Sequence, residues 1–501
     1  MGAQVCKEFN ENWPGKNELK YSEFQRSVLE DAKKLEKNIE RVKVNEIINN
    51  SKNFPIEFPI NSCRVEYQPQ ERYNIIEDQI NSVYPVIHER VVWLYTRFLE
   101  HKTKYGNSIE KEVYSNLDLI SFVHRLLTKR CVSFFGQYDK YLLISNEIGC
   151  NGHKPVGTLE EEPPLILKNC LSYDEAKLGA LLSVSSSTEF INDGERKNIG
   201  NVEKDKSKIE PEGIIIGLIG PRLVQRDFME FEDIIISEKQ NTLENSYGFN
   251  GNKNEITSKV DYRKMWNDFY GEEKDFLYDE IKACNNKRFG KLEKNEFVDN
   301  LVLKKRLTIS FDTLLLEAEA RACVSEKQAY IHVVGIGLGV WKYFDEQDDV
   351  FLATFTQRIK NLLPKLNHVS VIHFSYFKEG GYKELKNNAT FVSETHPNGG
   401  IKIYISNRNP HQKLDGVWTN CLPVVSYAWD GNALPGNEFW MKYLKSSGDS
   451  AAACSTLISE LHNPHINRKR VCGSNLYIAT ESSGVIHISE YIKNNFKDQG
   501  N

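Results

Sequence analysis

The second half of the chain alternates short apolar segments with helical patterns, and this alternation limits the fold more than any other feature. The apolar segments have the length of buried strands, while the segments between them carry apolar residues at helical spacing. Near-continuous apolar strands bounded by helices are typical of a mostly parallel sheet flanked by helices on both faces. The sequence therefore predicts an α/β fold. The expected strands are residues 213–220, 232–237, 330–335, 368–377, 401–406, 422–429 and 476–480, and the expected helices are residues 171–186, 310–326, 348–363, 450–461 and 488–495.

The first 150 residues have a different pattern. Residues 1–70 are polar and rich in Lys and Asn, so we expect a partly disordered segment with one helix over Val28–Val44. Residues 71–150 carry apolar stripes at helical spacing and predict a helical unit. The stripes are Ile87, Val91, Leu94 and Phe98, then Leu119, Phe122, Val123, Leu126 and Leu127. Residues 151–501 would form the α/β domain, with a loop at 187–200 and a charged linker at 201–212.

Composition excludes several classes of protein. The 501 residues are 40% hydrophobic, which is ample for a large core, and the formal net charge of −5 offers no general attraction to nucleic acid. No run of 18 apolar residues and no apolar segment in the first 20 residues is present, so we expect neither a membrane span nor a secretory signal. The ten cysteines include no Cys-x-x-Cys pair, which argues against zinc ribbons and redox sites and indicates a reducing, cytoplasmic location.

The first residues, MGAQVCK, are similar to an acylation signal. Gly2 is placed for myristoylation and Cys6 for palmitoylation, which together would supply the two anchors that stable membrane attachment needs. Cys6 replaces the usual Ser or Thr of the signal, and a Met-Gly start is also common in unmodified proteins. We therefore expect membrane association only where these residues are acylated.

Two loops after predicted strands are rich in features that suit a phosphate. Gly335, Gly337 and Gly339 follow strand 330–335, and glycines allow backbone amides to approach a phosphate closely. Their G-x-G-x-G spacing is not that of a dinucleotide fingerprint, and a tight turn explains it equally. Gly220 and Arg222 follow strand 213–220, where the arginine is either a phosphate ligand or a surface ion-pair partner.

The segment SYAWDGNALPGNEFW (426–440) is the richest in acids, carboxamides and aromatic residues. It follows the strand at 422–429, and in open α/β sheets ligands bind at the carboxyl ends of strands. Carboxylates and carboxamides there suit a ligand with many hydroxyls, although Asn, Asp, Gly and Pro also form structural turns. Ser447 to Asp449 follow as the cap of helix 450–461. The candidate residues are Asp430, Asn432, Gly436, Asn437, Glu438 and Asp449.

Taken together, these blocks resemble one family. The segments at 171–200, 217–237, 240–248, 330–341 and 426–464 are similar to those of the macrodomain-like ADP-ribosylhydrolases typified by MavL of Legionella, over about residues 155–480. The resemblance implies a macrodomain-like fold that binds ADP-ribose and removes it from arginine, as in modified ubiquitin. It also implies catalysis by aspartates near the distal ribose. Asp430 and Asp449 match best, whereas Glu438 is not an Asp.

A chemical scheme follows from the resemblance. One acid would hold the ribose hydroxyls while another orients or deprotonates water, and the anionic site would stabilise an oxocarbenium-like transition state. The glycine loop and Arg222 would hold the pyrophosphate, and Asn192, Asp193, Gly194 and Arg196 would close over the adenosine or the distal ribose. The scheme requires no metal and no cofactor. A non-catalytic ADP-ribose reader stays open, as does a metal-dependent nucleotidyl or phosphoryl transferase, although no Walker lysine is present.

Overall fold

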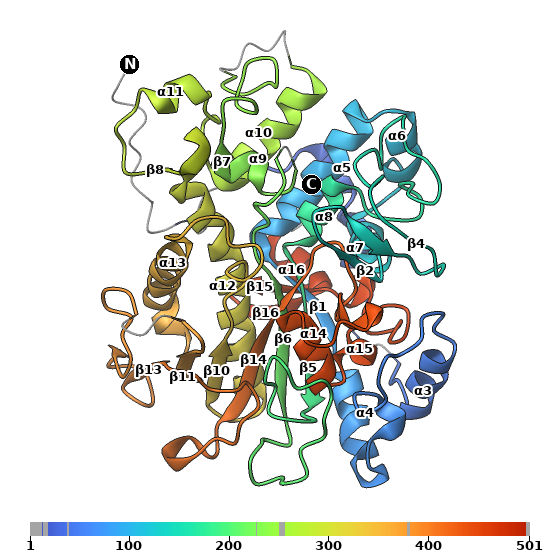
Figure 1. Cartoon of the computed structure of the whole chain (residues 1–501), viewed down its shortest axis with the longest axis vertical. Helices are drawn as coiled ribbons and strands as arrows, with labels where there is room; N and C mark the ends of the chain where they lie inside the picture. The colour runs from blue at the N-terminus through green and yellow to red at the C-terminus, as the bar shows by residue number, and fades with distance from the viewer. Residues whose placement is uncertain are drawn as a thin grey trace, which may run out of the picture.

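The computed structural model describes residues 13, 19–37, 40–226, 228–249, 256–377 and 381–496. Within these residues, ten strands form one large sheet that runs through the centre of the molecule (Figure 1). In spatial order the strands are β12 (Thr390–Val392), β13 (Gly400–Ile405), β11 (Val369–Phe374), β10 (Ala329–Val333), β14 (Leu422–Trp429), β6 (Glu212–Ile219), β5 (Leu182–Glu189), β1 (Tyr84–His88), β15 (Tyr477–Thr480) and β16 (Gly484–His487). The sequence prediction of an α/β fold is confirmed.

The sheet is mixed, with a parallel central half. Strands β13, β11, β10, β14 and β6 are parallel neighbours, as the apolar runs predicted. Strand β5 pairs antiparallel with both β6 and β1, and β1 pairs parallel with β15. Strands β12 and β16 close the two edges in antiparallel pairs. The parallel half carries the long crossover connections that contain helices, as parallel pairing requires.

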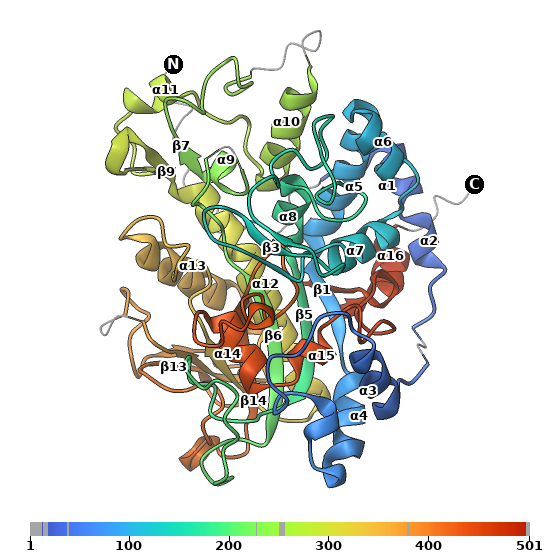
Figure 2. The same ribbon diagram turned by 45° about the vertical axis from the view of Figure 1, so that its right-hand side comes forward.

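Helices cover both faces of the sheet. The long helix α12 (Asn300–Val324) packs along one face, and α14 (Gly448–Ser455) packs on β14 from the other (Figure 2). The remaining α-helices are α1 (Glu23–Ser27), α2 (Glu30–Lys33), α3 (Val44–Lys52), α4 (Tyr73–Asn81), α5 (Glu89–Tyr105), α6 (Ser108–Tyr114), α7 (Leu119–Thr128), α8 (Tyr173–Gly179), α9 (Phe231–Ile234), α10 (Ser258–Tyr270), α11 (Tyr278–Lys282), α13 (Gln347–Leu362), α15 (Ile458–Leu461) and α16 (Ile488–Asn495). None of the helices in the described ranges is long and apolar enough to cross a membrane.

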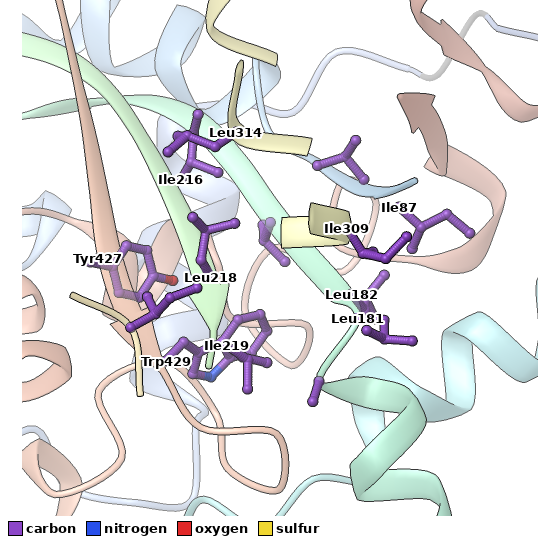
Figure 3. Packing of buried hydrophobic residues seen from close by; sticks show 14 of the residues in the cluster. Ile87, Leu181, Leu182, Ile216, Leu218, Ile219, Ile309, Leu314, Tyr427 and Trp429 are labelled. Carbon is purple, nitrogen blue, oxygen red and sulfur yellow. The ribbon is translucent and has the colours of Figure 1, made fainter. Parts of the chain in front are cut away.

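The main hydrophobic core lies between α12 and the sheet. Figure 3 shows Leu314 of α12 beside Ile216 of β6, and Ile309 of the same helix facing Ile87 of β1. All four side chains are fully buried. The same cluster extends to Ile47 of α3, so residues from both ends of the chain share one core. Two smaller antiparallel sheets contribute residues such as Phe134 and Val298 to the same cluster. They are β2 (Ser133–Phe135) with β3 (Lys140–Leu142) and β4 (Ile148–Gly149), and β7 (Ile235–Ile236) with β9 (Phe297–Asp299) and β8 (Phe289–Lys291).

Several local predictions are wrong. The helix predicted over Val28–Val44 is absent, because α1 ends at Ser27, α2 spans Glu30–Lys33 and α3 begins at Val44. The helix predicted at 171–186 ends at Gly179, and the chain then enters β5, whose antiparallel pairing on both sides overrides the helical pattern. The strand predicted at 232–237 is a short helix followed by β7.

The segment 71–150 is not purely helical. Ile87, which the helical stripe included, lies in β1, an interior strand of the large sheet, and helix α5 begins only at Glu89. Strands β2, β3 and β4 also belong to this segment. The division of the chain at residues 70 and 150 stays a prediction. Gly2 and Cys6, the predicted acylation sites, lie outside the described residues.

Candidate active site

The loops after three neighbouring parallel strands enclose a cavity. Strands β10, β14 and β6 lie side by side and run in the same direction, so their carboxyl ends meet at one edge of the sheet. This edge is where open α/β sheets bind ligands. The cavity has a volume of about 560 Å³, a size typical of sites for small organic ligands. The predicted site residues that line it are Gly194, Arg196, Gly220, Arg222, Gly335, Gly337, Gly339, Asp430, Asn437, Glu438 and Asp449.

Asp430 is the first residue after β14 and is held by three hydrogen bonds, two to its carboxylate and one to its backbone carbonyl. The backbone N–H of Asn432 donates to Oδ1 at 3.2 Å, and the side-chain amide of Asn437 donates to Oδ2 at 3.2 Å. The guanidinium of Arg130 donates to the backbone carbonyl of Asp430 at 3.2 Å and also stacks over the Trp429 ring, 4.1 Å from its centroid. The carboxylate is therefore fixed in direction at the wall of the cavity.

Burial changes the acidity of Asp430. The side chain is only 7% exposed, and this loss of hydration raises its pKa to about 6. The positive charge of Arg222 opposes the rise, while the negative charge of Glu438 adds to it. A carboxyl group with a pKa near neutrality, placed in a cavity, is well suited to proton transfer at physiological pH.

Asp449 lies in the first turn of α14 and organises the loop before it. Ser447 caps this helix by accepting a hydrogen bond from Ser450 N–H, as predicted. The Asp449 carboxylate accepts one hydrogen bond from the Gly436 N–H at 2.8 Å and another from the Asn437 N–H at 3.0 Å. Burial raises the pKa of Asp449 well above its usual value, and the charge of Glu438 adds to this effect. The two aspartates are thus linked through Asn437.

Glu438 is the most accessible of the three acids. Its side chain is half-buried at the cavity wall, where one carboxylate oxygen accepts a hydrogen bond from the Ser447 hydroxyl at 2.7 Å. The same serine thus caps α14 and orients Glu438. The cavity therefore brings three carboxyl groups together, two of them deeply buried.

Two glycine loops meet at the cavity. A Cβ on Gly220 would lie 2.4 Å from the backbone nitrogen of Gly337, so the loops after β6 and β10 approach too closely for any side chain there. Gly337 also has a φ of +75°, which favours glycine. Gly339 has open space around it. The G-x-G-x-G segment is therefore a tight turn that also lines the cavity.

Arg222 is not a surface residue. It is 5% exposed, lines the cavity and lies with its guanidinium 5.5 Å from the centroid of the Phe134 ring. Its nearest acid is Asp139, 3.8 Å away, and two guanidinium nitrogens, Nε and Nη1, have no hydrogen-bond partner. A buried guanidinium with unused donors at a cavity wall is suited to an anionic ligand group.

The loop at 191–196 closes one side of the cavity. Asn192 accepts from Gly194 N–H and donates to the backbone carbonyl of Cys454, so it ties the loop to α14. Asp193 accepts from the Asn409 side chain at 2.7 Å. Arg196 reaches across to donate to the backbone carbonyl of Ser446 at 2.8 Å. Gly194 and Arg196 line the cavity, whereas Asn192 and Asp193 hold the loop in place.

Four predicted residues lie outside the cavity wall: Asn192, Asp193, Asn432 and Gly436. Asn432 is buried, and its side-chain amide contacts the ring of His153 at 3.0 Å. Gly436 has a φ of +87° and faces the Ala453 methyl group. Both residues therefore shape the loop that carries Asp430 and Asn437.

Sequence reasoning missed several cavity residues. His332 lies in the interior of β10 and is only 2% exposed, yet it lines the cavity. Its Nε2 contacts the Arg408 carbonyl at 3.0 Å, its Nδ1 has no partner, and burial lowers its pKa to about 3. His411 stacks on Phe190 with 3.8 Å between ring centroids. Other missed lining residues are Phe135, Trp341, Tyr376, Tyr427 and Tyr443. Trp341 and Tyr427 lie within segments singled out in the sequence, 330–341 and 426–440, whereas no pattern marked Phe135 or Tyr376 as a neighbour of the site.

The fold and the site together define an α/β protein with an acid-lined ligand cavity at the carboxyl ends of its parallel strands. The family model described as ADP-ribosylhydrolase MavL-like matches residues 45–494, which is most of the chain. The chain therefore belongs to the MavL-like ADP-ribosylhydrolase family, and the family resemblance found in the sequence is confirmed. The match begins well before residue 155, where the resemblance was expected to start.

Two Drosophila melanogaster proteins are close relatives. ADP-ribosylarginine hydrolase CG2909 is 50% identical over 473 residues, which cover 94% of this chain and 93% of that protein. ADP-ribosylarginine hydrolase CG3568 is 47% identical over 485 residues, which cover 96% of this chain and 94% of that protein. Among the described residues, no group of three or more His, Cys, Asp or Glu side chains is arranged to hold a metal ion.

Proposed function

We propose that this protein is an ADP-ribosylarginine hydrolase, which cleaves the N-glycosidic bond between ADP-ribose and an arginine side chain. One observation carries the proposal: relatives about 50% identical over nearly their full length bear this activity in their names. The cavity agrees with it, because it combines buried carboxyl groups with a guanidinium, that of Arg222, two of whose nitrogens donate no hydrogen bond. The fold is macrodomain-like in this proposal.

ADP-ribose would lie across the three strand ends. Its pyrophosphate is assigned to the backbone amides of the loops at Gly220 and Gly337 and to the guanidinium of Arg222, whose free donors match phosphate oxygens. The distal ribose is assigned to the loop that carries Asp430 and Asn437. Gly194 and Arg196 close the opposite side of the cavity. Holding the pyrophosphate fixes the anomeric carbon beside the acids.

The acids would then divide the chemistry. Asp430, ionised above its pKa of about 6, orients a water molecule and accepts its proton as the water oxygen bonds to the anomeric carbon. The carbon–nitrogen bond breaks, its electron pair returns to the guanidine nitrogen, and the proton follows. The negative charges of the site stabilise the oxocarbenium-like transition state. Asp449 keeps the loop in register through its two backbone hydrogen bonds.

The arginine linkage fits an anionic site better than a carboxylate ester. A guanidine leaving group gains from protonation and from a neighbouring anion such as Glu438, whereas the carboxylate released from an ester would be repelled. Protein-linked ADP-ribose on arginine is the substrate class of this proposal, and ubiquitin is one candidate carrier.

The test compares two substrates. Arginine-linked ADP-ribosyl-ubiquitin and a glutamate-linked ADP-ribosylated protein are incubated separately with the enzyme, and released ADP-ribose is measured by chromatography. We expect multiple turnovers on the arginine-linked substrate and little release from the ester. Faster release from the glutamate-linked substrate would contradict the proposed specificity for arginine-linked ADP-ribose. Tight ADP-ribose binding by calorimetry without any turnover would identify a reader instead of a hydrolase.

A further inference from the structure

A second cavity lies apart from the active site. It has a volume of about 830 Å³ and shares no lining residue with the acid-lined cavity. Helix α7 forms one side, and the chain leading into the short helix η8 (Gly473–Asn475) forms the other. We name it the α7 groove. Its lining residues are Val113, Leu117, Ile120, Ser121, His124, Arg125, Thr128, Lys129, Lys168, Arg468, Lys469, Cys472, Gly473 and Ser474.

The charged side chains of the α7 groove are all basic. No Asp or Glu is among the lining residues. Two of the cations are already neutralised from outside the groove: Arg125 by Glu175, and Lys469 by Glu40 and Glu46. Lys129 and Lys168 form no ion pair with any described residue, and the side chain of Arg468 donates a hydrogen bond to the backbone carbonyl of His465 at 2.8 Å. Three cations from three separate segments therefore meet without an anion.

Burial and the neighbouring positive charges both lower the pKa values of two residues of the groove. Burial lowers the pKa of Lys129, and the charge of Arg125 lowers it further. Burial likewise lowers the pKa of His124, and the charge of Lys129 adds to that effect. A positive potential that disfavours further protonation favours a bound anion.

One wall of the α7 groove is apolar. Val113, Leu117 and Ile120 are half-buried, pack against the core and present their remaining surface to the groove. This wall packs closely against the other side of the groove, because a Cβ on Gly473 would lie only 2.0 Å from the Ile120 carbonyl oxygen. A free phosphate would use the cations and leave this wall bare. A peptide with both acidic and apolar side chains would use both parts of the groove.

We propose that the α7 groove binds an acidic peptide segment of a partner protein. Its carboxylates contact Lys129, Lys168 and Arg468, and one apolar side chain lies on Leu117 and Ile120. This site is independent of the proposed hydrolase activity, since the two cavities share no residue. The occupant is an extended, acidic stretch of another chain, and the groove recognises charge together with one apolar anchor.

The test measures binding of a fluorescein-labelled peptide, EDELFDE, to the full-length protein by fluorescence anisotropy at 150 mM salt. Two control peptides separate the contributions: one replaces the acids with Gln and Asn, and the other replaces Leu-Phe with Ser-Ser. We expect saturable binding of the first peptide and at least tenfold weaker binding of each control. No saturable binding at millimolar protein, or equal binding of the Ser-Ser peptide, would overturn the proposal, the latter by indicating a simple anion site.

A charge-reversal pair locates the site. The variant K129E/K168E/R468E should lose at least tenfold in affinity, while K204E/K206E/K239E, which changes the net charge equally at exposed lysines outside the α7 groove, should stay within twofold. Equal losses in both variants would indicate general electrostatic attraction and contradict the groove. Unchanged melting temperatures and hydrolase activity establish that the groove variant is folded; if it is not, L117S is used in its place with the same expectation.

Discussion

Asn437 connects the two buried aspartates of the cavity. Its side-chain amide donates to Asp430, and its backbone N–H donates to Asp449 at 3.0 Å. The same side chain also exchanges two hydrogen bonds with the backbone of Phe134, at 2.7 and 2.8 Å. A residue more than 300 positions away in sequence thereby holds the acid loop against β2. Asn437 therefore supplies one of the two hydrogen bonds that hold the Asp430 carboxylate.

Replacing Asn437 with Ala tests this role. The change leaves the buried N–H and carbonyl of Phe134 without partners, each at a cost of ~1–3 kcal/mol, and it frees the Asp430 carboxylate. We expect a lower melting temperature and a fall in turnover larger than the fall in ADP-ribose affinity. Thermal denaturation and steady-state kinetics measure the two effects. A variant with wild-type turnover would show that Asp430 needs no such support.

Replacing Asp430 with Asn should lower the hydrolase activity and raise the stability of the fold. Removal of a positioned acid or base usually lowers the rate ~10²–10⁴-fold. At neutral pH the buried carboxylate destabilises the fold, since a pKa raised from 3.8 to about 6 corresponds to ~3 kcal/mol. The Asn variant avoids this destabilisation, but the loss of one hydrogen bond offsets ~1 kcal/mol of the improvement. We expect unfolding in urea at pH 7.5 to require ~1–2 kcal/mol more than for the wild type. A destabilised Asn variant would mean that Asp430 is structural.

The pH profile follows from the direction of the same shift. A raised pKa keeps Asp430 protonated up to about pH 6, so an enzyme that needs the carboxylate loses activity as the pH falls through that value, not near pH 4. The fall should approach tenfold per pH unit. Because the pKa of Asp449 is also raised, the acid limb of the pH–activity profile reports the titration of both aspartates together. Activity that instead rises as the pH falls below 6 would assign Asp430 the role of a general acid.

Arg222→Lys probes the proposed pyrophosphate contact. Lysine keeps the charge but loses the planar pair of donors, so ADP-ribose should bind roughly tenfold or more weakly, in line with ~1.5–3 kcal/mol for a hydrogen bond to a charged group. AMP, which lacks the pyrophosphate, should bind weakly to both proteins. Arg226→Lys is the matched control, because Arg226 is partly exposed and pairs with Glu296 outside the cavity. Calorimetric titration measures each affinity; equal losses in the two variants would exclude a specific contact.

Apolar strands were predictable, and polar ones were not. The segments at 213–220, 330–335 and 422–429 are strands β6, β10 and β14 within a residue or two, because a buried parallel strand must be apolar on both sides. Strand β5 reads LSVSSSTE and carries too few apolar residues to be recognised. It is a strand because β1 and β6 supply its hydrogen bonds from either side. Tertiary pairing therefore overrides local preference.

The candidate site shows the same division. Asp430, Arg222 and the glycines could be predicted, since each follows a strand whose carboxyl end defines the site. His332 and His411 could not, because they come from a strand interior and a distant loop and reach the cavity only through the sheet order. The contact between Phe134 and Asn437 likewise has no trace in the local sequence. Local sequence patterns do not reveal which distant segments the fold brings to the cavity.

Strand β1 has a consequence for the order in which the molecule assembles. Residues 84–88 leave the ribosome long before one of their two neighbours in the sheet, because β1 pairs with β5 and with β15, which begins only at Tyr477. The sheet can therefore be completed only after β15 has been synthesised, and residues 151–501 on their own would expose one edge of β5 and one of β15. Such distant pairing is slow and leaves strand edges open to other chains during synthesis. Loss of either β1 or β15 would therefore leave an interior strand of the sheet without one of its partners.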